Sequence, residues 1–392
     1  MSGPLFKNYN KINDYLLKFE VHNCNSSIVN ALRRLIITDV KTYGFNTDDY
    51  NNSDLLIEKN SSSLHNEFIL HRLGLIPIHF DFDTFDHTKY KFSLDVQNKT
   101  DEIIDVTTKD FVVTNLETNE VEDTEKFFPK NSITNDYILI VRLKPTNDKQ
   151  GEVLKLSGKC SKGYGRQHIR FSPVCKSIFV NKRDPDKVTA ELKKYLQDKG
   201  ELDDEKLMSL KRKFELEEAD KHFYTDKNGD PNVFEFTIES IGILKSYKIL
   251  SESINVIINK LKKFLKNLEK TFNTQDSSIE IVESTSVMKA FDIVIDNENH
   301  TLGFLLQYYI NKFYEKDDIF VGYMNPHPLQ KNIKLRIKQN DGDISKIQSV
   351  LSDTSEQIIK IFSELKKEVM REFEGVQPFK VKKSKGKGKS KE

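Results

Sequence analysis

Two short acidic stretches carry side chains that could hold a metal ion, but neither has the spacing that the ion requires. Residues 79–83 (HFDFD) resemble an acidic magnesium-binding loop, yet Thr84 follows where a glycine would let the backbone wrap a small octahedral ion. Residues 226–230 (DKNGD) begin like a calcium loop, but Pro231 and Thr237 stand at its positions six and twelve. The sharp turn and the bidentate carboxylate are therefore both missing. We interpret the first stretch as a strand end and the second as a turn.

The other residues with chemical potential also lack a motif. Gly388, Lys389 and Ser390 would need a glycine at position 383 to form a phosphate-binding loop, and Lys383 stands there with no strand before it. The nine histidines do not cluster with cysteines at ligand spacing, and structural roles suit them better. No serine or cysteine has the sequence context of a nucleophile. We expect no catalytic residue, no cofactor and no metal site in this chain.

Composition separates the body of the chain from its C-terminal end. The 392 residues include 61 Lys and Arg against 60 Asp and Glu, a formal charge of +1 that excludes a wholesale polyanion binder. Residues 380–392 hold seven Lys and one Glu, which leaves 54 basic and 59 acidic residues, a net charge of −5, for the rest. Hydrophobic residues make up 37% of the chain, a polar but globular balance. The length suggests about two or three domains.

Three cysteines, Cys24, Cys160 and Cys175, form no CxxC pair, so neither a disulfide framework nor a zinc cluster is supported. A reducing compartment fits best. The N-terminus has no apolar signal region, and no stretch approaches the roughly 18 apolar residues of a membrane span. We expect a soluble protein that is not secreted and has no membrane partner.

A strand–turn–helix pattern occurs twice. Residues 15–21 (YLLKFEV) are rich in strand formers, and a polar turn and a helical stripe of Ile28, Leu32, Leu35 and Ile36 follow. Residues 290–296 (AFDIVID) are followed in the same way by a turn and a stripe of Leu302, Leu305, Leu306, Tyr309 and Ile310. A second strand, at 233–240 or 332–338, and a long amphipathic helix close each unit. Because each unit must cover its apolar stripes, we expect the two copies to pair within the chain. Generic strand–helix patterning is the alternative explanation.

The first unit is interrupted by two long stretches. Residues 47–172 contain short alternating runs such as KFSLDV and YILIVRL, which predict a strand-rich inserted domain. Residues 181–231 are highly charged and predict a helical excursion on the surface. The basic residues at the C-terminus are too polar to fold alone.

Several segments, in order, resemble the α-like subunits of multisubunit DNA-directed RNA polymerases. Residues 24–40 (CNSSIVNALRRLIITDV), 60–78 (NSSSLHNEFILHRLGLIPI), 161–174 (SKGYGRQHIRFSPV) and 233–244 (VFEFTIESIGIL) are similar to the eukaryotic third subunit and its archaeal D counterpart. Residues 297–310 (NENHTLGFLLQYYI) and 321–338 (VGYMNPHPLQKNIKLRIK) are similar to eukaryotic subunit eleven and its archaeal L counterpart. Some members carry a four-cysteine metal loop in the inserted domain, and this chain has no cysteine at about 80–135.

The resemblance implies an α+β fold with two α-like dimerisation modules that form an intramolecular pseudo-dimer. The expected units are a subunit-three-like dimerisation domain (1–46 and 173–275, with a charged excursion at about 181–231), a strand-rich inserted domain (47–172), a subunit-eleven-like dimerisation domain (286–375) and a disordered basic tail (376–392). Leu32, Leu35 and Ile36 would face Leu302, Leu305 and Leu306 in the pseudo-dimer core. A fused chain of this kind is typical of nucleocytoplasmic large DNA viruses, which implies the host cytoplasm (viral factory) and the virion as locations. The nucleus is expected otherwise.

The family role implied is a noncatalytic assembly platform that binds the second-largest polymerase subunit and small subunits similar to eukaryotic ten and twelve. Further copies of this chain are not expected as partners. The residues expected to contact other subunits are Arg33, Arg34, His65, Arg72, Lys162, Gly163, Gly165, Arg166 and His168. For Arg33 and Arg34 a solvated helix face is the alternative, and for Gly163 and Gly165 a flexible surface turn whose glycines permit positive φ.

A stand-alone nucleic-acid-binding protein acting through the lysine tail is the alternative function. The tail could instead aid solubility or localisation. It has no aromatic residue after Phe379, which argues against base stacking and leaves only weak, salt-sensitive contact with DNA.

Overall fold

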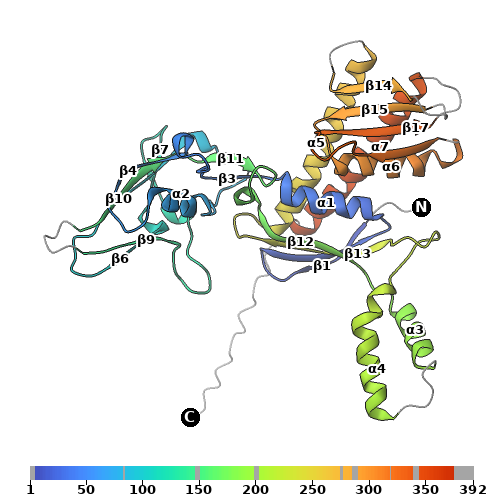
Figure 1. The fold of residues 1–392 in the computed structure, drawn as a ribbon, viewed down its shortest axis with the longest axis horizontal. Coiled ribbons are helices and arrows are strands. Elements are labelled where there is room, and N and C mark those ends of the chain that lie inside the picture. The colour runs from blue at the N-terminus through green and yellow to red at the C-terminus, as the bar shows by residue number, and fades with distance from the viewer. Residues whose placement is uncertain are drawn as a thin grey trace, which may run out of the picture.

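A computed structural model describes residues 5–82, 84–145, 151–197, 203–273, 277–284, 290–317, 319–338 and 344–374 (Figure 1). The predicted basic tail at 376–392 lies outside the described residues, as does Asp83 of the acidic stretch. No helix within the described ranges is long and apolar enough to cross a membrane.

The first module is an antiparallel four-stranded sheet in the order β1-β2-β13-β12, covered by two helices. Its elements are β1 (Leu5–Lys11), β2 (Leu16–His22), α1 (Ser26–Thr38), β12 (Val174–Asn181), β13 (Val233–Ser240) and α5 (Ser246–Phe272). The N-cap of α1 is Asn25, whose side chain accepts a hydrogen bond from the Ser27 amide, as a helix start requires.

The second module repeats this plan in the strand order β14-β15-β17-β16. Its elements are β14 (Ile279–Glu283), β15 (Ala290–Asp296), α6 (His300–Phe313), β16 (Phe320–Met324), β17 (Asn332–Lys338) and α7 (Ile344–Glu374). Asn299 caps α6 in the way that Asn25 caps α1. The predicted α+β class and the internal repeat are confirmed, and each copy also contains two edge strands that the sequence patterns did not predict.

The two modules share one hydrophobic core. In Figure 1, α1 lies between its own sheet and α6, while α5 and α7 run side by side past both modules. At the far end of α7, Phe373 packs edge-on against Tyr9 of β1, with ring centroids 5.2 Å apart. At the far end of α5, the Asn267 side chain donates to Ser278 beside β14 at 2.7 Å. Each long helix therefore extends to the sheet of the other module.

The inserted unit has its own core. It contains a five-stranded sheet in the order β4-β10-β5-β7-β8, the pair β6–β9 and the ribbon β3–β11. Its elements are β3 (Lys41–Gly44), β4 (Leu55–Asn60), α2 (Asn66–Gly74), β5 (Tyr90–Gln97), β6 (Ile104–Thr107), β7 (Val112–Asn115), β8 (Val121–Glu122), β9 (Leu139–Leu143), β10 (Val153–Gly158) and β11 (Ser161–Tyr164). Tyr43 and Phe45 pack in this core, ahead of the expected boundary at residue 47.

The charged excursion is a pair of helices, α3 (Pro185–Gln197) and α4 (Asp204–Glu217), that projects from the β12–β13 end of the first sheet (Figure 1). Phe214 is the one buried residue of α4; it packs against the tilted ring of Tyr195 and stacks on His222. At the base, Arg183 donates to Asp220 at 2.6 Å and pairs with Glu215.

Candidate functional site

The six residues expected in the pseudo-dimer core are all buried, and the helices that carry them, α1 and α6, pack against each other. Leu32, Leu35 and Ile36 on α1, and Leu302, Leu305 and Leu306 on α6, are each at most 2% exposed and belong to one cluster. Burial of each such side chain contributes roughly 1.5–3 kcal/mol. The contact between these helices is therefore a folding core rather than a loose interface.

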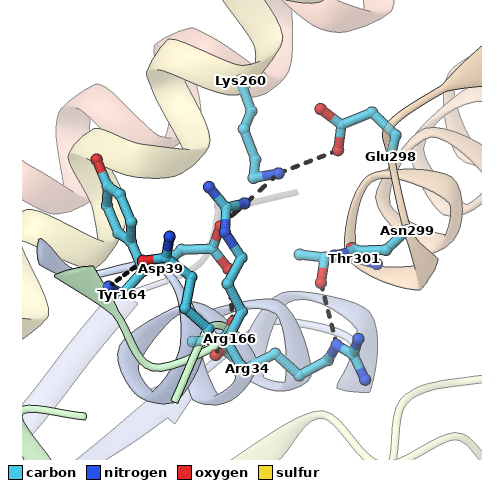
Figure 2. A network of polar contacts seen from close by, with 10 residues as sticks. Arg34, Asp39, Tyr164, Arg166, Lys260, Glu298, Asn299 and Thr301 are labelled. Carbon is cyan, nitrogen blue, oxygen red and sulfur yellow. Dashed lines mark hydrogen bonds and ion pairs between the residues drawn. The ribbon is translucent and has the colours of Figure 1, made fainter. Parts of the chain in front are cut away.

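Polar contacts lie along one side of this core, and Arg34 makes one that joins the two modules. Its Nε donates to the Thr301 hydroxyl at 3.1 Å, which joins α1 to the first turn of α6 (Figure 2). The sequence pattern placed Arg34 off the apolar stripe of α1, and the structure gives it a partner in the other module. Such a contact between residues far apart in the chain has no signal in local spacing.

A second set of contacts connects both modules to the return segment, residues 161–173, which leads from the inserted unit back to β12. The carboxylate of Asp39, only 5% exposed, accepts from Arg166 Nη1 at 3.0 Å. Lys260 of α5 lies 4.0 Å from the same carboxylate and 3.1 Å from that of Glu298, just before α6 (Figure 2). A buried carboxylate needs such partners to offset its desolvation. These contacts therefore fix the return segment against α1, α5 and α6 together.

The predicted glycine-rich loop is a strand followed by a tight turn. Gly163 lies in β11, paired with β3, and Gly165 begins the turn. A Cβ on Gly163 would lie 2.4 Å from the Phe171 ring, and one on Gly165 would lie 2.0 Å from the Ile37 carbonyl oxygen. Neither glycine has positive φ. The alternative explanation, that these glycines permit positive φ, was wrong, because close approach of the backbone to neighbouring atoms is what excludes a side chain here.

Arg170 organises this junction, and the sequence reasoning missed it. Its side chain is 4% exposed, pairs with Asp48 and donates to the Phe45 carbonyl at 2.8 Å. His168 Nδ1 accepts from the Arg170 backbone amide at 3.1 Å and from its Nε at 3.0 Å. His168 therefore orients Arg170 and is not a free contact group. The only sequence feature that could have pointed to Arg170 was its position two residues after His168.

Lys162 and Arg166 are exposed on the same segment, and both lie near the Tyr164 ring, at 5.7 Å and 5.1 Å from its centroid. Arg166 thus binds Asp39 with one nitrogen while the rest of its side chain faces the surface. This arrangement can present positive charge to an acidic partner.

On the inserted unit, His65 and Arg72 lie at opposite ends of α2. His65 is the exposed N-cap residue and makes no side-chain capping bond. Arg72 donates to the Leu139 carbonyl at 2.7 Å and remains exposed. Leu75 is 51% exposed because α2 ends at Gly74 and the chain turns there. Gly74 packs against Arg170. The return segment therefore connects α2 to the module seam, the contact between α1 and α6.

Arg33 and Arg34 have no carboxylate partner among the described residues. Arg33 donates to the Asn30 side chain of its own helix at 3.0 and 3.1 Å. Partial burial lowers the pKa of Arg33, and the neighbouring Arg34 charge lowers it further. Two adjacent guanidinium groups in this setting can present positive charge to an anionic partner.

Comparison with known proteins gives two matches to family models with the same description. The RNA polymerase Rpb3/Rpb11 dimerisation domain matches at residues 18–261 and again, as a second model, at residues 290–368. The two regions correspond to the two modules.

Three relatives illustrate the similarity. The chain is 27% identical over 307 residues to "DNA-directed RNA polymerases II, IV and V subunit 3" of Arabidopsis thaliana, covering 67% of this chain and 92% of the relative. It is 29% identical over 291 residues to "DNA-directed RNA polymerases I and III subunit rpac1" of Dictyostelium discoideum, covering 66% and 80%. A protein of Acanthamoeba polyphaga mimivirus with the name "Putative DNA directed RNA polymerase subunit" is 25% identical over 374 residues, covering 89% and 88%. The chain belongs to the RNA polymerase Rpb3/Rpb11 dimerisation domain family, and it contains two such domains.

Proposed function

We propose that this chain is the noncatalytic assembly platform of a multisubunit DNA-dependent RNA polymerase, with both dimerisation partners in one polypeptide. The observation that carries the proposal is the single core that α1, α5, α6 and α7 build from two modules of one polymerase family. Tethering supports it, because a linked partner acts at roughly millimolar effective concentration and pairing does not depend on a second chain.

The docking surface in this proposal extends from the module seam to the inserted unit. Arg33 and Arg34 offer positive charge on α1, Lys162 and Arg166 offer it on the return segment, and His65 and Arg72 offer polar groups on α2. We assign the first two sites to the second-largest polymerase subunit. We assign the α2 side to small subunits similar to eukaryotic ten and twelve.

The mimivirus relative supports a viral origin, since its match covers most of this chain. The proposal then places the protein with the polymerase in the factories of the host cytoplasm, and in the virion if the polymerase is packaged.

The test is affinity purification of the tagged full-length chain from the cells that produce it, with identification of the recovered proteins. We expect the two largest polymerase subunits, and their absence would overturn the proposal. In the variant with Arg33→Glu and Arg34→Glu, we expect reduced recovery of the second-largest subunit. The double variant with Lys211→Glu and Arg212→Glu on the projecting helix α4 is the matched control, because it makes the same charge change at two adjacent exposed sites. Equal recovery by both variants would remove Arg33 and Arg34 from the interface.

A further inference from the structure

The two modules carry residues of different chemistry at the equivalent surface positions Asn30 and Phe304. The shared Asn25 and Asn299 caps align α1 with α6, so that Asn30 on α1 corresponds to Phe304 on α6. Asn30 binds the Arg33 side chain, whereas Phe304 is 45% exposed. An exposed phenylalanine at the position of a polar residue indicates that the second module has a different surface chemistry there.

Phe304 belongs to a rigid aromatic cluster. Tyr323 of β16 packs 4.8 Å from Phe304, measured between ring centroids, and its hydroxyl lies 2.7 Å from His300 Nδ1. Gly303 makes this packing possible, because a Cβ there would lie 2.2 Å from the Tyr323 ring. His300 also stacks on Phe304 at 6.1 Å. The three rings are therefore fixed before any partner binds, which lowers the entropy that binding would cost.

Arg34 brings positive charge to this cluster from the other module. Its Nε donates to Thr301 (Figure 2), the residue after His300, so the guanidinium is held next to the chain that carries the cluster. The charge of Arg34 acts on the Tyr323 hydroxyl: burial raises the pKa of Tyr323, and Arg34 partly opposes this rise. Arg34 and the rings are thus neighbours, and no carboxylate of the described chain pairs with Arg34.

We propose that Phe304, Tyr323, His300 and Arg34 form a second docking surface across the module seam. Its occupant is a segment of another polymerase subunit that carries a bulky apolar side chain within about one helical turn of a carboxylate. The apolar group packs on Phe304 and Tyr323, and the carboxylate accepts from the free end of the Arg34 guanidinium. This inference rests on the proposed function for the identity of the partner.

Two features of the structure favour such an occupant. The surface adjoins the α1–α6 contact, because Tyr323 packs against the core shared by both modules and Arg34 of α1 is bound to Thr301 of α6. A guanidinium without a carboxylate in the described chain, beside exposed aromatic rings, is complementary to an acidic and apolar segment and not to a basic one. Since the equivalent site on α1 is polar, the two sides of the pseudo-dimer are not interchangeable, and each partner binds in one orientation.

The experiment is photo-crosslinking of the tagged full-length chain in its producing cells, with benzoylphenylalanine in place of Phe304. Ile133, which is 90% exposed on the inserted unit, carries the same probe in the control. Mass spectrometry then identifies the crosslinked peptide. We expect a peptide of a polymerase subunit with a carboxylate close to a bulky apolar residue. In parallel, Phe304→Ser should weaken recovery of that subunit by about tenfold, with unchanged thermal stability, whereas Ile133→Ser should leave the recovery unchanged.

The outcomes separate this inference from the proposed function. If the large subunits are recovered but position 304 crosslinks no more than position 133, the second surface is refuted and the platform role stands. If no polymerase subunit is recovered and position 304 gives no crosslink, both the second surface and the platform role are refuted. A crosslink to an acidic, apolar segment of some other protein, without the polymerase, would support the surface and refute the platform role. A crosslink to a second copy of this chain would overturn the inference.

Discussion

Replacement of Leu306 by Ala tests whether the two modules fold as one unit. Leu306 of α6 is fully buried, in a cluster that extends over both modules. Loss of such a side chain costs about 2–5 kcal/mol, which includes the cavity that remains. The inserted unit has a separate core around Phe92 and Leu154, so its stability should not change in this variant. We therefore expect both modules to lose stability together while the inserted unit keeps its own.

Segment-resolved hydrogen exchange is the suitable assay, because the chain has no tryptophan to report on each core. For slowly exchanging amides of β13 in the first module and β17 in the second, the expected loss of protection is roughly 30-fold to several thousand-fold. Amides of β5 and β10 in the inserted unit should change little. Leu329→Ala, at an 86% exposed site of the second module, is the matched control and should stay within about 0.5 kcal/mol of the parent.

The shared core would be refuted if Leu306→Ala reduced protection in the second module only. That result would mean that the first module has an independent core and that the shared cluster is a contact between separately stable units. An equal effect on the inserted unit would instead show that its core is not separate.

Three further predictions concern particular residues. Gly165→Ala should lower stability by about 1–3 kcal/mol, seen as a lower thermal midpoint, because its Cβ would meet a backbone oxygen at 2.0 Å. Partial burial opposes ionisation of Glu20, but hydrogen bonds from Lys182, Asn8 and His22 outweigh it and lower its pKa from 4.5 to about 2. The stabilisation from Glu20 is thus complete above about pH 4.5 and is lost as the pH falls towards 2, so acid unfolding of Glu20→Gln should be less steep in this window. In the native protein, iodoacetamide should label Cys175, which is exposed, but not Cys24 or Cys160, whose burial raises their thiol pKa.

Each of these has a control. Gly322→Ala should be tolerated, since its nearest neighbouring atom would lie 4.0 Å from the new Cβ, and an equal loss there would contradict the close-approach argument. For Glu20→Gln, an acid-unfolding curve identical to that of the parent would show that ionised Glu20 does not stabilise the folded state. For the cysteines, labelling after unfolding should reach all three, and native labelling of Cys24 would contradict its burial in the shared core.

The repeated architecture could be predicted because its signals are local. The stripes of α1 and α6 follow helical spacing, and their Asn caps precede them, so both helices are visible in the sequence. The edge strands were missed for a physical reason. β1 (LFKNYNK) lies at the edge of its sheet with mostly exposed or half-buried residues, and it therefore lacks the alternation of a buried strand.

The candidate site was predictable only in part, because its contacts join distant segments. Periodicity could place Arg34 off the apolar stripe but could not show that Thr301 receives its hydrogen bond. The sequence shows a glycine at position 165 but not why a glycine is needed there. The reason is the close approach of Gly165 to Ile37, which depends on how the return segment packs on α1. Leu75 is apolar, yet it follows the last turn of α2 and is 51% exposed.

The most direct test of the central claim is the subunit stoichiometry of the native RNA polymerase, purified from the producing cells and measured by native mass spectrometry. If one chain supplies both dimerisation partners, the complex should contain one copy of this chain for each copy of the largest and second-largest subunits, with no separate subunit-eleven-like protein. Two copies of this chain per complex, or an active polymerase that lacks it, would contradict the account.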